Sequence, residues 1–155
     1  MNKAEELVTY LQSKGWKLRC VESCTAGGLS AAVGAVAGVS SVLDRSWVTY
    51  SNLAKHEEVG VPLGLIETYG AVSEEVVLAM AEGAIKGCES NTLSLSISGI
   101  AGPDGGTVEK PVGMVWIGLK APQQQTIAQC FHFKGARLEV QQQAISQALA
   151  MPLQE

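Results

Sequence analysis

Residues 21–28 of the chain read Val-Glu-Ser-Cys-Thr-Ala-Gly-Gly and pass from a strand-like run into hydroxyl residues and glycines. The run at 17–22 predicts a strand, and the small residues at 28–36, which suit close packing on a sheet, predict a helix after it. A buried strand delivers its last side chain to the sheet edge, and the first amides of the next helix point at the same place. The stretch therefore predicts an α/β fold with a candidate nucleophile, Ser23, at that edge. The alternative is that these hydroxyls and glycines serve only as helix caps.

Helical and strand-like patterns alternate over the first two thirds of the chain. The patterns predict helices over 5–14, 28–36, 52–59, 74–86 and 140–149, with a helical turn at 40–43. They predict strands over 17–22, 47–50, 93–97, 114–119 and 126–133. The last two strands are expected to pair antiparallel, which predicts a three-layer α/β/α sandwich with a mixed, mostly parallel sheet. At 155 residues the chain is expected to form a single domain over 1–155.

Composition and charge exclude several classes of protein. The net charge is -4 at pH 7 and the Lys and Arg residues are scattered, so nucleic acid is not an expected partner. No apolar run reaches the roughly 18 residues of a membrane span, and the acidic residues at 1–6 differ from a signal peptide. We therefore expect a cytoplasmic protein with no membrane partner.

The cysteines do not follow a metal-binding or disulfide pattern. The four of them, Cys20, Cys24, Cys88 and Cys130, form no CxxC pair, and the chain has only 2 histidines that could join them as ligands. The spacings of zinc sites and of disulfide frameworks are both missing. We expect reduced, mostly buried thiols and no metal site.

Three segments with chemically useful residues follow three of the predicted strands. They are residues 23–25 (Ser-Cys-Thr), residues 50–52 (Tyr-Ser-Asn) with Lys55, and the glycine-rich run 99–106. If the three strands are parallel, their ends meet at one edge of the sheet. The alternatives are that the glycine run only connects two strands and that Lys55 is a solvated surface residue.

At these segments the chain resembles a known family. The matching motifs lie at 22–25, 48–52 with Lys55, 70–74, 98–106 and 109–113, and together they span nearly the whole chain. They resemble the C-terminal amidase domain of CinA and the nicotinamide-nucleotide amidases of the PncC type. The resemblance implies that a small-molecule nucleotide, nicotinamide mononucleotide, is hydrolysed to nicotinic acid mononucleotide and ammonia, with no metal or organic cofactor. It also implies a homo-oligomer.

Matched by motif, the serine and lysine pair of the family corresponds to Ser23 and Lys55. A serine hydroxyl is a poor nucleophile until a base removes its proton, and a desolvated, neutral lysine can act as that base. Tyr50 is a third candidate catalytic residue, because its hydroxyl could donate to the lysine or to the serine; simple packing is the alternative. Cys24 competes as nucleophile, although we expect its side chain to point into the core.

Backbone amides are expected to supply most contacts with the substrate. Amides near Thr25 to Gly27 are the candidate oxyanion hole. The glycine run can present amides to a phosphate, and Arg137 can grip the same group with its planar fork. The candidate substrate-binding residues are Thr25, Ala26, Gly27, Asn52, Gly99, Gly102, Gly105, Gly106 and Arg137.

The chain departs from the family pattern near its last helix. The pattern is Gly-Asp-Arg, two variable residues, then Val-Arg, whereas residues 135–141 read Gly-Ala-Arg-Leu-Glu-Val-Gln. Ala136 thus replaces the aspartate, and Gln141 replaces the second arginine without its charge, which is expected to weaken binding of an anionic nucleotide. Two alternatives therefore stay open: a non-catalytic nucleotide-binding paralogue, and a Ser-Lys amidase with another substrate.

Overall fold

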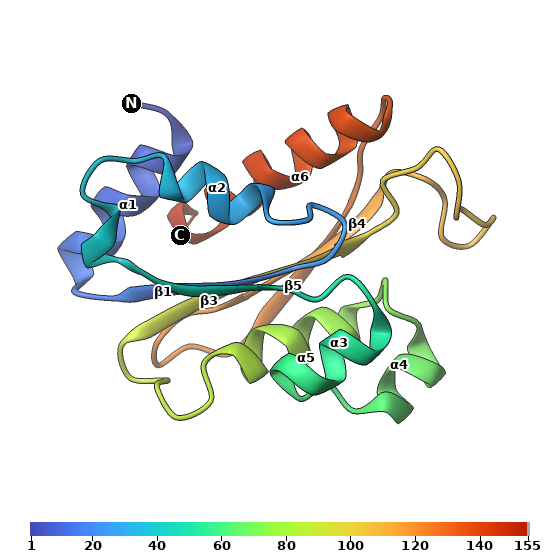
Figure 1. Cartoon of the computed structure of the whole chain (residues 1–155), viewed down its shortest axis with the longest axis horizontal. Helices are drawn as coiled ribbons and strands as arrows, with labels where there is room; N and C mark the ends of the chain where they lie inside the picture. The colour runs from blue at the N-terminus through green and yellow to red at the C-terminus, as the bar shows by residue number, and fades with distance from the viewer. Residues whose placement is uncertain (155) are drawn as a thin grey trace.

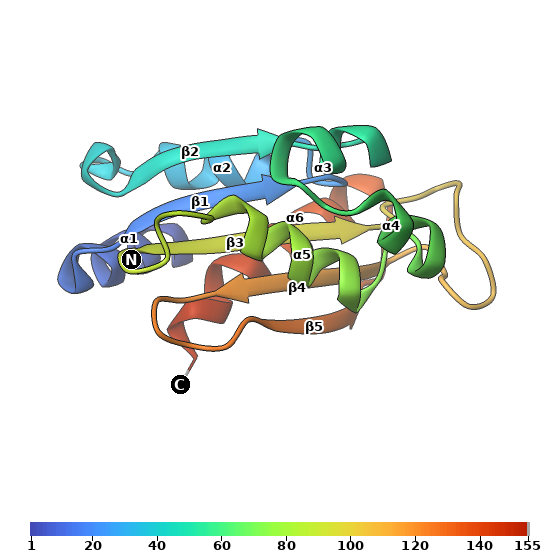
Figure 2. The ribbon, with the colours of Figure 1, turned by 90° about the horizontal axis from the view of Figure 1, so that it is seen from below.

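A five-stranded mixed sheet forms the middle layer of the molecule, with helices on both faces (Figure 1). The structure is a computed structural model and describes residues 1–154. The strands are β1 (Lys17–Glu22), β2 (Leu43–Val48), β3 (Thr92–Gly99), β4 (Met114–Lys120) and β5 (Ile127–His132), in the order β2-β1-β3-β4-β5. Only β4 runs against the other strands, because it pairs antiparallel with both β3 and β5 (Figure 2). The predicted mixed, mostly parallel sheet is confirmed.

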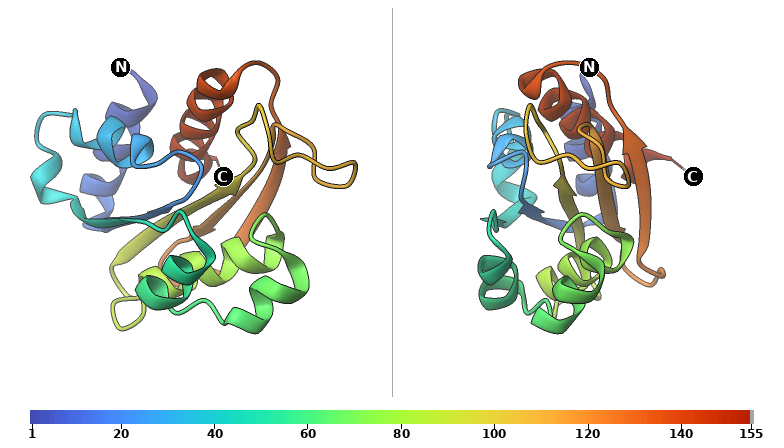
Figure 3. Two further views of the ribbon diagram at one scale, coloured as in Figure 1. Left: turned by 45° about the vertical axis from the view of Figure 1, so that its right-hand side comes forward. Right: turned by 90° about the vertical axis from the view of Figure 1, so that its right-hand side faces the viewer.

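The helices form the two outer layers. One face is covered by α1 (Lys3–Lys14), α2 (Gly28–Gly34) and α6 (Arg137–Ala150), and the other by α3 (Asn52–Val59), α4 (Leu63–Tyr69) and α5 (Glu74–Ala84) (Figure 3). Two short 3-10 turns are η1 (Val39–Ser41) and η2 (Met151–Leu153). Within residues 1–154, no helix is long and apolar enough to cross a membrane. The predicted three-layer sandwich is confirmed.

The two faces of β3 are packed in different ways. Leu93, Leu95 and Ile97 are buried in the core beneath α1, α2 and α6. On the other face, serine hydroxyls donate to backbone carbonyls of α5 and the segment before it: Ser94 to Ala81 (2.6 Å), Ser96 to Val77 (2.7 Å) and Ser98 to Ala71 (2.8 Å). Buried hydroxyls need partners, and these short side chains meet that need by bringing α5 close to the sheet.

The parallel strands bring the three candidate segments to one edge. β1 lies between β2 and β3 and pairs parallel with each, so the carboxyl ends of all three strands point the same way (Figure 2). Residues 23–25 follow β1, residues 50–52 follow β2, and residues 99–106 lie at the end of β3. The expectation that these segments meet is confirmed.

Two element boundaries differ from the prediction for reasons visible at the site. β2 covers 43–48 rather than 47–50; it ends two residues early because the carbonyls of Thr49 and Tyr50 turn toward Lys55, and it begins earlier because residues 43–47 pair with β1. α6 begins at 137 rather than 140, because the Glu139 carboxylate accepts the Ala136 N–H at 2.9 Å and stabilises an additional first turn.

The helices on the α3–α5 side also differ from the prediction. Ser51 caps α3, since its hydroxyl accepts the Ala54 N–H at 3.0 Å. α4 has no polar N-cap and follows Pro62, so the sequence carried no start signal for it; burial of Ile66 holds it in place. α2 and α5 end at residues 34 and 84, two residues before their predicted ends at 36 and 86.

Candidate active site

Ser23 and Lys55 meet at the carboxyl edge of the sheet. Ser23 directly follows β1, and its N–H still donates to the Ile97 carbonyl of β3 at 3.1 Å. Lys55 lies near the start of α3, on the helix that follows β2. The Lys55 Nζ lies 3.2 Å from the Ser23 Oγ. A strand end and a short helix thus place an amine and a hydroxyl within hydrogen-bond distance.

We call Ser23, Lys55 and the carbonyls of Thr49 and Tyr50 the floor of the site. The Lys55 Nζ donates to those carbonyls at 2.8 and 3.3 Å. Lys55 is 1% exposed, and no carboxylate within residues 1–154 forms an ion pair with it. Because burial penalises the charged amine, the pKa of Lys55 falls from 10.5 to about 8. The Ser23 hydroxyl donates to the Tyr50 carbonyl at 3.4 Å, and the Lys55 Nζ donates to the Ser23 Oγ. Once Lys55 is neutral, it keeps two N–H groups for the carbonyls and gains one lone pair that can accept the serine proton instead.

Glu22, the last residue of β1, organises the turn that carries Ser23. It is fully buried, and its carboxylate accepts four hydrogen bonds. The donors are Thr25 Oγ1 (2.6 Å), Leu29 N (2.8 Å), Ser30 N (2.9 Å) and Ser30 Oγ (2.5 Å). The sequence analysis missed this role. The available signal was an acidic residue at a buried strand end, a few residues before hydroxyls and a helix start, where its charge is stabilised.

The amides of the nucleophile turn, residues 23–28, are not equally available. The Ala26 N–H donates to the Ser23 carbonyl at 3.0 Å, and the Gly28 N–H donates to the Thr25 carbonyl at 2.9 Å. The amides of Cys24, Thr25 and Gly27 have no acceptor within residues 1–154. Ala26 also adopts a left-handed φ of 49°, which costs about 1 kcal/mol and marks a strained turn.

A cavity of about 250 Å³ opens above the floor. It is lined by Ser23, Cys24, Tyr50, Lys55, Ala71, Val72, Ser98, Gly99, Ile100, Ala101, Gly102, Asp104, Gly105 and Arg137. Seven candidate residues are among them: Ser23, Tyr50, Lys55, Gly99, Gly102, Gly105 and Arg137. Five candidates do not line it: Thr25, Ala26, Gly27, Asn52 and Gly106. The binding and catalytic roles of all these residues stay predictions.

We call the side chains of Tyr50 and Arg137 with the Gly102 carbonyl the rim of the site. Arg137 donates to the Gly102 carbonyl and to the Tyr50 hydroxyl, both at 2.7 Å. The Tyr50 hydroxyl therefore contacts Arg137 rather than Lys55 or Ser23, and only its backbone carbonyl contacts Lys55. Tyr50 is 52% exposed, so the rim faces solvent.

The segment after β3 carries two charged residues, Asp104 and Lys110, that lie differently with respect to the cavity. Asp104 lines the cavity and adds a negative charge to it. Lys110 instead donates to the Tyr69 carbonyl at 2.6 Å and lies outside the cavity. Of Lys110 and Arg137, Arg137 alone therefore lines the pocket.

The two competing reactive groups near the floor are poorly suited to the chemistry. Cys24 is 4% exposed, and burial raises the pKa of its thiol to about 11, so little thiolate is present near neutral pH. The imidazole of His56 contacts the Val61 carbonyl at 2.9 Å and does not line the cavity. No three His, Cys, Asp or Glu side chains in the described part of the chain are grouped as metal ligands would be.

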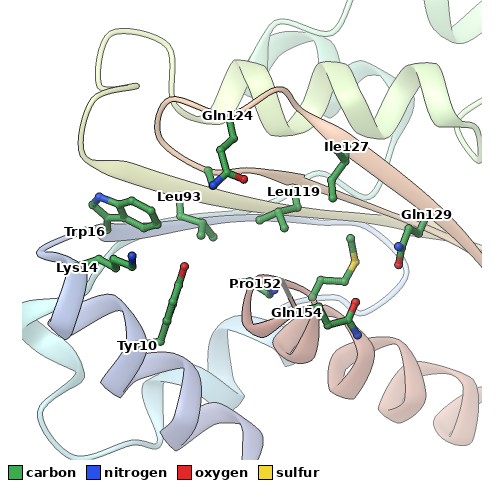
Figure 4. Close-up of a pocket in the computed structure, with 12 residues that line it drawn as sticks. Tyr10, Lys14, Trp16, Leu93, Leu119, Gln124, Ile127, Gln129, Pro152 and Gln154 are labelled. Carbon is green, nitrogen blue, oxygen red and sulfur yellow. The ribbon is translucent and has the colours of Figure 1, made fainter.

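A larger cavity, of about 500 Å³, lies at the opposite end of the sheet (Figure 4). Tyr10 and Trp16 border it beside the start of β1, and Leu93 and Leu119 form its apolar side. Among residues 1–154, its lining contains Lys14 but no serine, cysteine, histidine or carboxylate. Without a serine or cysteine beside that lysine, this cavity does not compete with the Ser23 pocket as a hydrolytic site.

Fold and pocket define an α/β/α protein with a small cavity, lined by a serine and a lysine, at the carboxyl edge of its sheet. The chain belongs to the CinA C-terminal domain family, whose model matches residues 1–155. It is 45% identical over 150 residues to the nicotinamide-nucleotide amidohydrolase PncC of Enterobacter agglomerans, covering 97% of this chain and 91% of that protein. It is 41% identical to the PncC of Escherichia coli K12, covering 96% and 90%.

Solved structures with the same fold agree with the family assignment. The competence/damage inducible protein CihA of Agrobacterium tumefaciens superposes with a TM-score of 0.91 at 35% identity, covering 99% of this chain and 95% of that one. A CinA superfamily protein of Escherichia coli gives a TM-score of 0.91 at 32% identity, covering 97% and 87%.

Proposed function

We propose that the chain is an amidohydrolase that converts nicotinamide mononucleotide into nicotinic acid mononucleotide and ammonia. The observation that carries the proposal is the buried contact of 3.2 Å between the Lys55 Nζ and the Ser23 Oγ. The two PncC relatives are named nicotinamide-nucleotide amidohydrolases, and this supports the choice of substrate. The same proposal includes a cytoplasmic location and a homo-oligomer. Light scattering of the purified chain measures the mass of the oligomer.

Acylation begins with neutral Lys55. Its lone pair accepts the Ser23 proton while Oγ forms a bond to the carboxamide carbon, and the carbonyl oxygen becomes an oxyanion. When the tetrahedral intermediate collapses, the C–N bond breaks and the Lys55 ammonium gives its proton to the leaving nitrogen. Ammonia leaves, and the nicotinoyl group stays on Ser23 as an ester.

Deacylation repeats the steps with water. Neutral Lys55 accepts a proton from water, whose oxygen attacks the ester carbon, and the proton then returns to the departing Ser23 Oγ. The product is a carboxylate. Because its pKa is about 8, Lys55 can exchange protons in both directions near neutral pH without a large cost.

The oxyanion requires donors that are not already engaged. The Ala26 amide is bonded to the Ser23 carbonyl, which argues against it as a donor. We therefore assign this role first to the amide of Cys24, which lines the cavity, and then to the next amide, that of Thr25, which has no acceptor within residues 1–154 although Thr25 is not among the lining residues. Loss of one such donor typically costs on the order of 3 kcal/mol of transition-state stabilisation.

The rim is the proposed site of the nucleotide phosphate. Arg137 supplies the positive charge, and the glycine loop at 99–106 supplies amides in conformations that glycine adopts readily. Gln141 does not line the cavity. This supports an active enzyme over the alternative of a binding protein without turnover.

Ammonia release from nicotinamide mononucleotide by the purified chain tests the proposal. Ser23→Ala should be at least about a thousandfold slower. Ser46→Ala is the matched control, because the Ser46 hydroxyl has no hydrogen-bond partner within residues 1–154, and it should keep the full rate. Full activity of Ser23→Ala would show that Ser23 is not the nucleophile. Ammonia release from other amides only would show that the substrate is not nicotinamide mononucleotide. Calorimetric binding of nicotinamide mononucleotide without ammonia release would support the non-catalytic paralogue.

A further inference from the structure

Gln141 contacts the nucleophile turn from the helix behind it. It lies in the second turn of α6, and its Nε2 donates to the Cys24 carbonyl at 2.9 Å. Gln141 is half-buried and does not line the cavity, so its amide faces the turn and not a ligand. The bond joins residues 117 positions apart and connects α6 to the residue after Ser23.

The direction of the Cys24 carbonyl determines the direction of the next backbone N–H in this turn. A peptide unit is planar and trans, so its N–H points opposite to its carbonyl. Holding the Cys24 carbonyl toward α6 therefore fixes the direction of the Thr25 N–H, which has no acceptor within residues 1–154. Glu22 holds the Thr25 hydroxyl on the same turn at 2.6 Å. The turn is thus held by Gln141 on its backbone and by Glu22 on its side chain.

The left-handed Ala26 adds strain that neighbouring contacts must offset. A strained backbone conformation persists only when neighbouring contacts determine it, and Ala26 follows the Cys24–Thr25 peptide directly. Without Gln141, the Cys24 carbonyl loses its hydrogen-bond donor within residues 1–154. Rotation of the peptide would turn the Thr25 amide away from the position that the oxyanion requires, and would loosen the turn that carries Ser23.

We propose that Gln141 is a positioning residue, which aligns the Cys24–Thr25 peptide and thereby sets the turnover rate, not the affinity for substrate. This rests on the proposed function for the identity of the reaction, but not for the alignment of Ser23. The proposal also gives a role to Gln141, for which the sequence indicated only that the charge of the family's arginine is absent.

The test compares two glutamines on the same helix. Gln141→Met removes the hydrogen bond and preserves length and helix propensity. Gln143→Met is the matched control, since Gln143 also donates to backbone carbonyls, those of Lys134 and Glu139, but lies away from the site. Gln141→Arg keeps an N–H donor at similar reach. Each variant is measured for kcat and KM with nicotinamide mononucleotide, for Tm, and for the rate at which a fluorophosphonate modifies Ser23, followed by intact mass.

Gln141→Met should lower kcat and the rate of Ser23 modification by about tenfold, with KM within about twofold. Its Tm should fall no more than that of Gln143→Met, which should keep full activity. Gln141→Arg should keep kcat within about threefold of the parent. An unchanged kcat in Gln141→Met, or a loss confined to KM, would overturn the inference. If no nicotinamide mononucleotide is hydrolysed but Ser23 modification still depends on Gln141, the proposed function fails and the inference stands.

Discussion

The floor and the rim of the site differ in how they are held. In the floor, Lys55 is 1% exposed, and its partners are backbone carbonyls four to six residues away and one serine. In the rim, Tyr50 is 52% exposed, and Arg137 reaches it from 87 positions along the chain. Burial adjusts the basicity of a group, whereas an exposed cation keeps its charge and is screened by salt. These differences fit the proposed division, in which the floor carries the reaction and the rim binds the substrate.

The largest effect should come from removing the base of the floor. Lys55→Met should lower kcat by about a thousandfold, because the serine loses the group that accepts its proton, while KM changes by less than about threefold. Steady-state ammonia release at several substrate concentrations separates the two constants. A kcat within about tenfold of the parent would show that the floor does not perform the chemistry.

The same substitution should reveal the energetic cost of burying an amine. A pKa lowered from 10.5 in the unfolded chain to about 8 in the folded one means that the unfolded state binds more protons between these pH values. The parent should therefore gain about 3 kcal/mol of stability relative to Lys55→Met as the pH rises from 7 to 10.5. Urea unfolding of both proteins at the two pH values measures this gain. A difference independent of pH would mean that the Lys55 pKa is ordinary.

A substitution in the rim should change KM and leave kcat nearly unchanged. Arg137→Met should raise KM roughly ten- to a hundredfold and leave kcat within about threefold, because a charge-assisted contact is worth about 1.5–3 kcal/mol. Arg45→Met is a suitable control, since Arg45 pairs with Asp44 on β2, away from the cavity. Substrate-saturation curves for the three proteins test this. A fall in kcat at unchanged KM would place Arg137 in the floor instead.

The smallest effect concerns the stability of the N-terminus of α6, which carries the rim residue Arg137. Ala136 is the N-cap residue of α6 and offers no side-chain oxygen to the helix. Ala136→Ser should stabilise the protein by about 1 kcal/mol and raise Tm by roughly 2–4 °C, with kcat unchanged. Thermal unfolding followed by circular dichroism measures it. An unchanged Tm would indicate that the Glu139 contact already satisfies this helix end, and a lower Tm would contradict the prediction.

Local signals predicted the elements well, but long-range contacts set several boundaries. The strand at 17–22 and the helix at 52–59 match their predicted ranges, because alternation and caps act within a few residues. The end of β2 was predicted two residues late, because Lys55 draws carbonyls out of the ladder. α4 lacked any start signal, since packing and not capping stabilises it.

The same distinction holds in the site. Ser23 and Lys55 were identifiable because each follows a strand, and motif matching paired them. The contacts of Glu22 and Gln141 were not identifiable, because each depends on how a turn and a helix meet in space. For the same reason, the Tyr50 hydroxyl was expected at the floor and lies in the rim.

The pH dependence of kcat/KM tests the central claim most directly, namely that a neutral Lys55 activates Ser23. At low concentrations of nicotinamide mononucleotide the rate reports the free enzyme, so kcat/KM should rise with pH and level off above an apparent pKa of about 8, because only the neutral amine accepts the serine proton. A kcat/KM that stays constant from about pH 6 to 9 would contradict the account, since a lysine base with this pKa changes its protonation across that range.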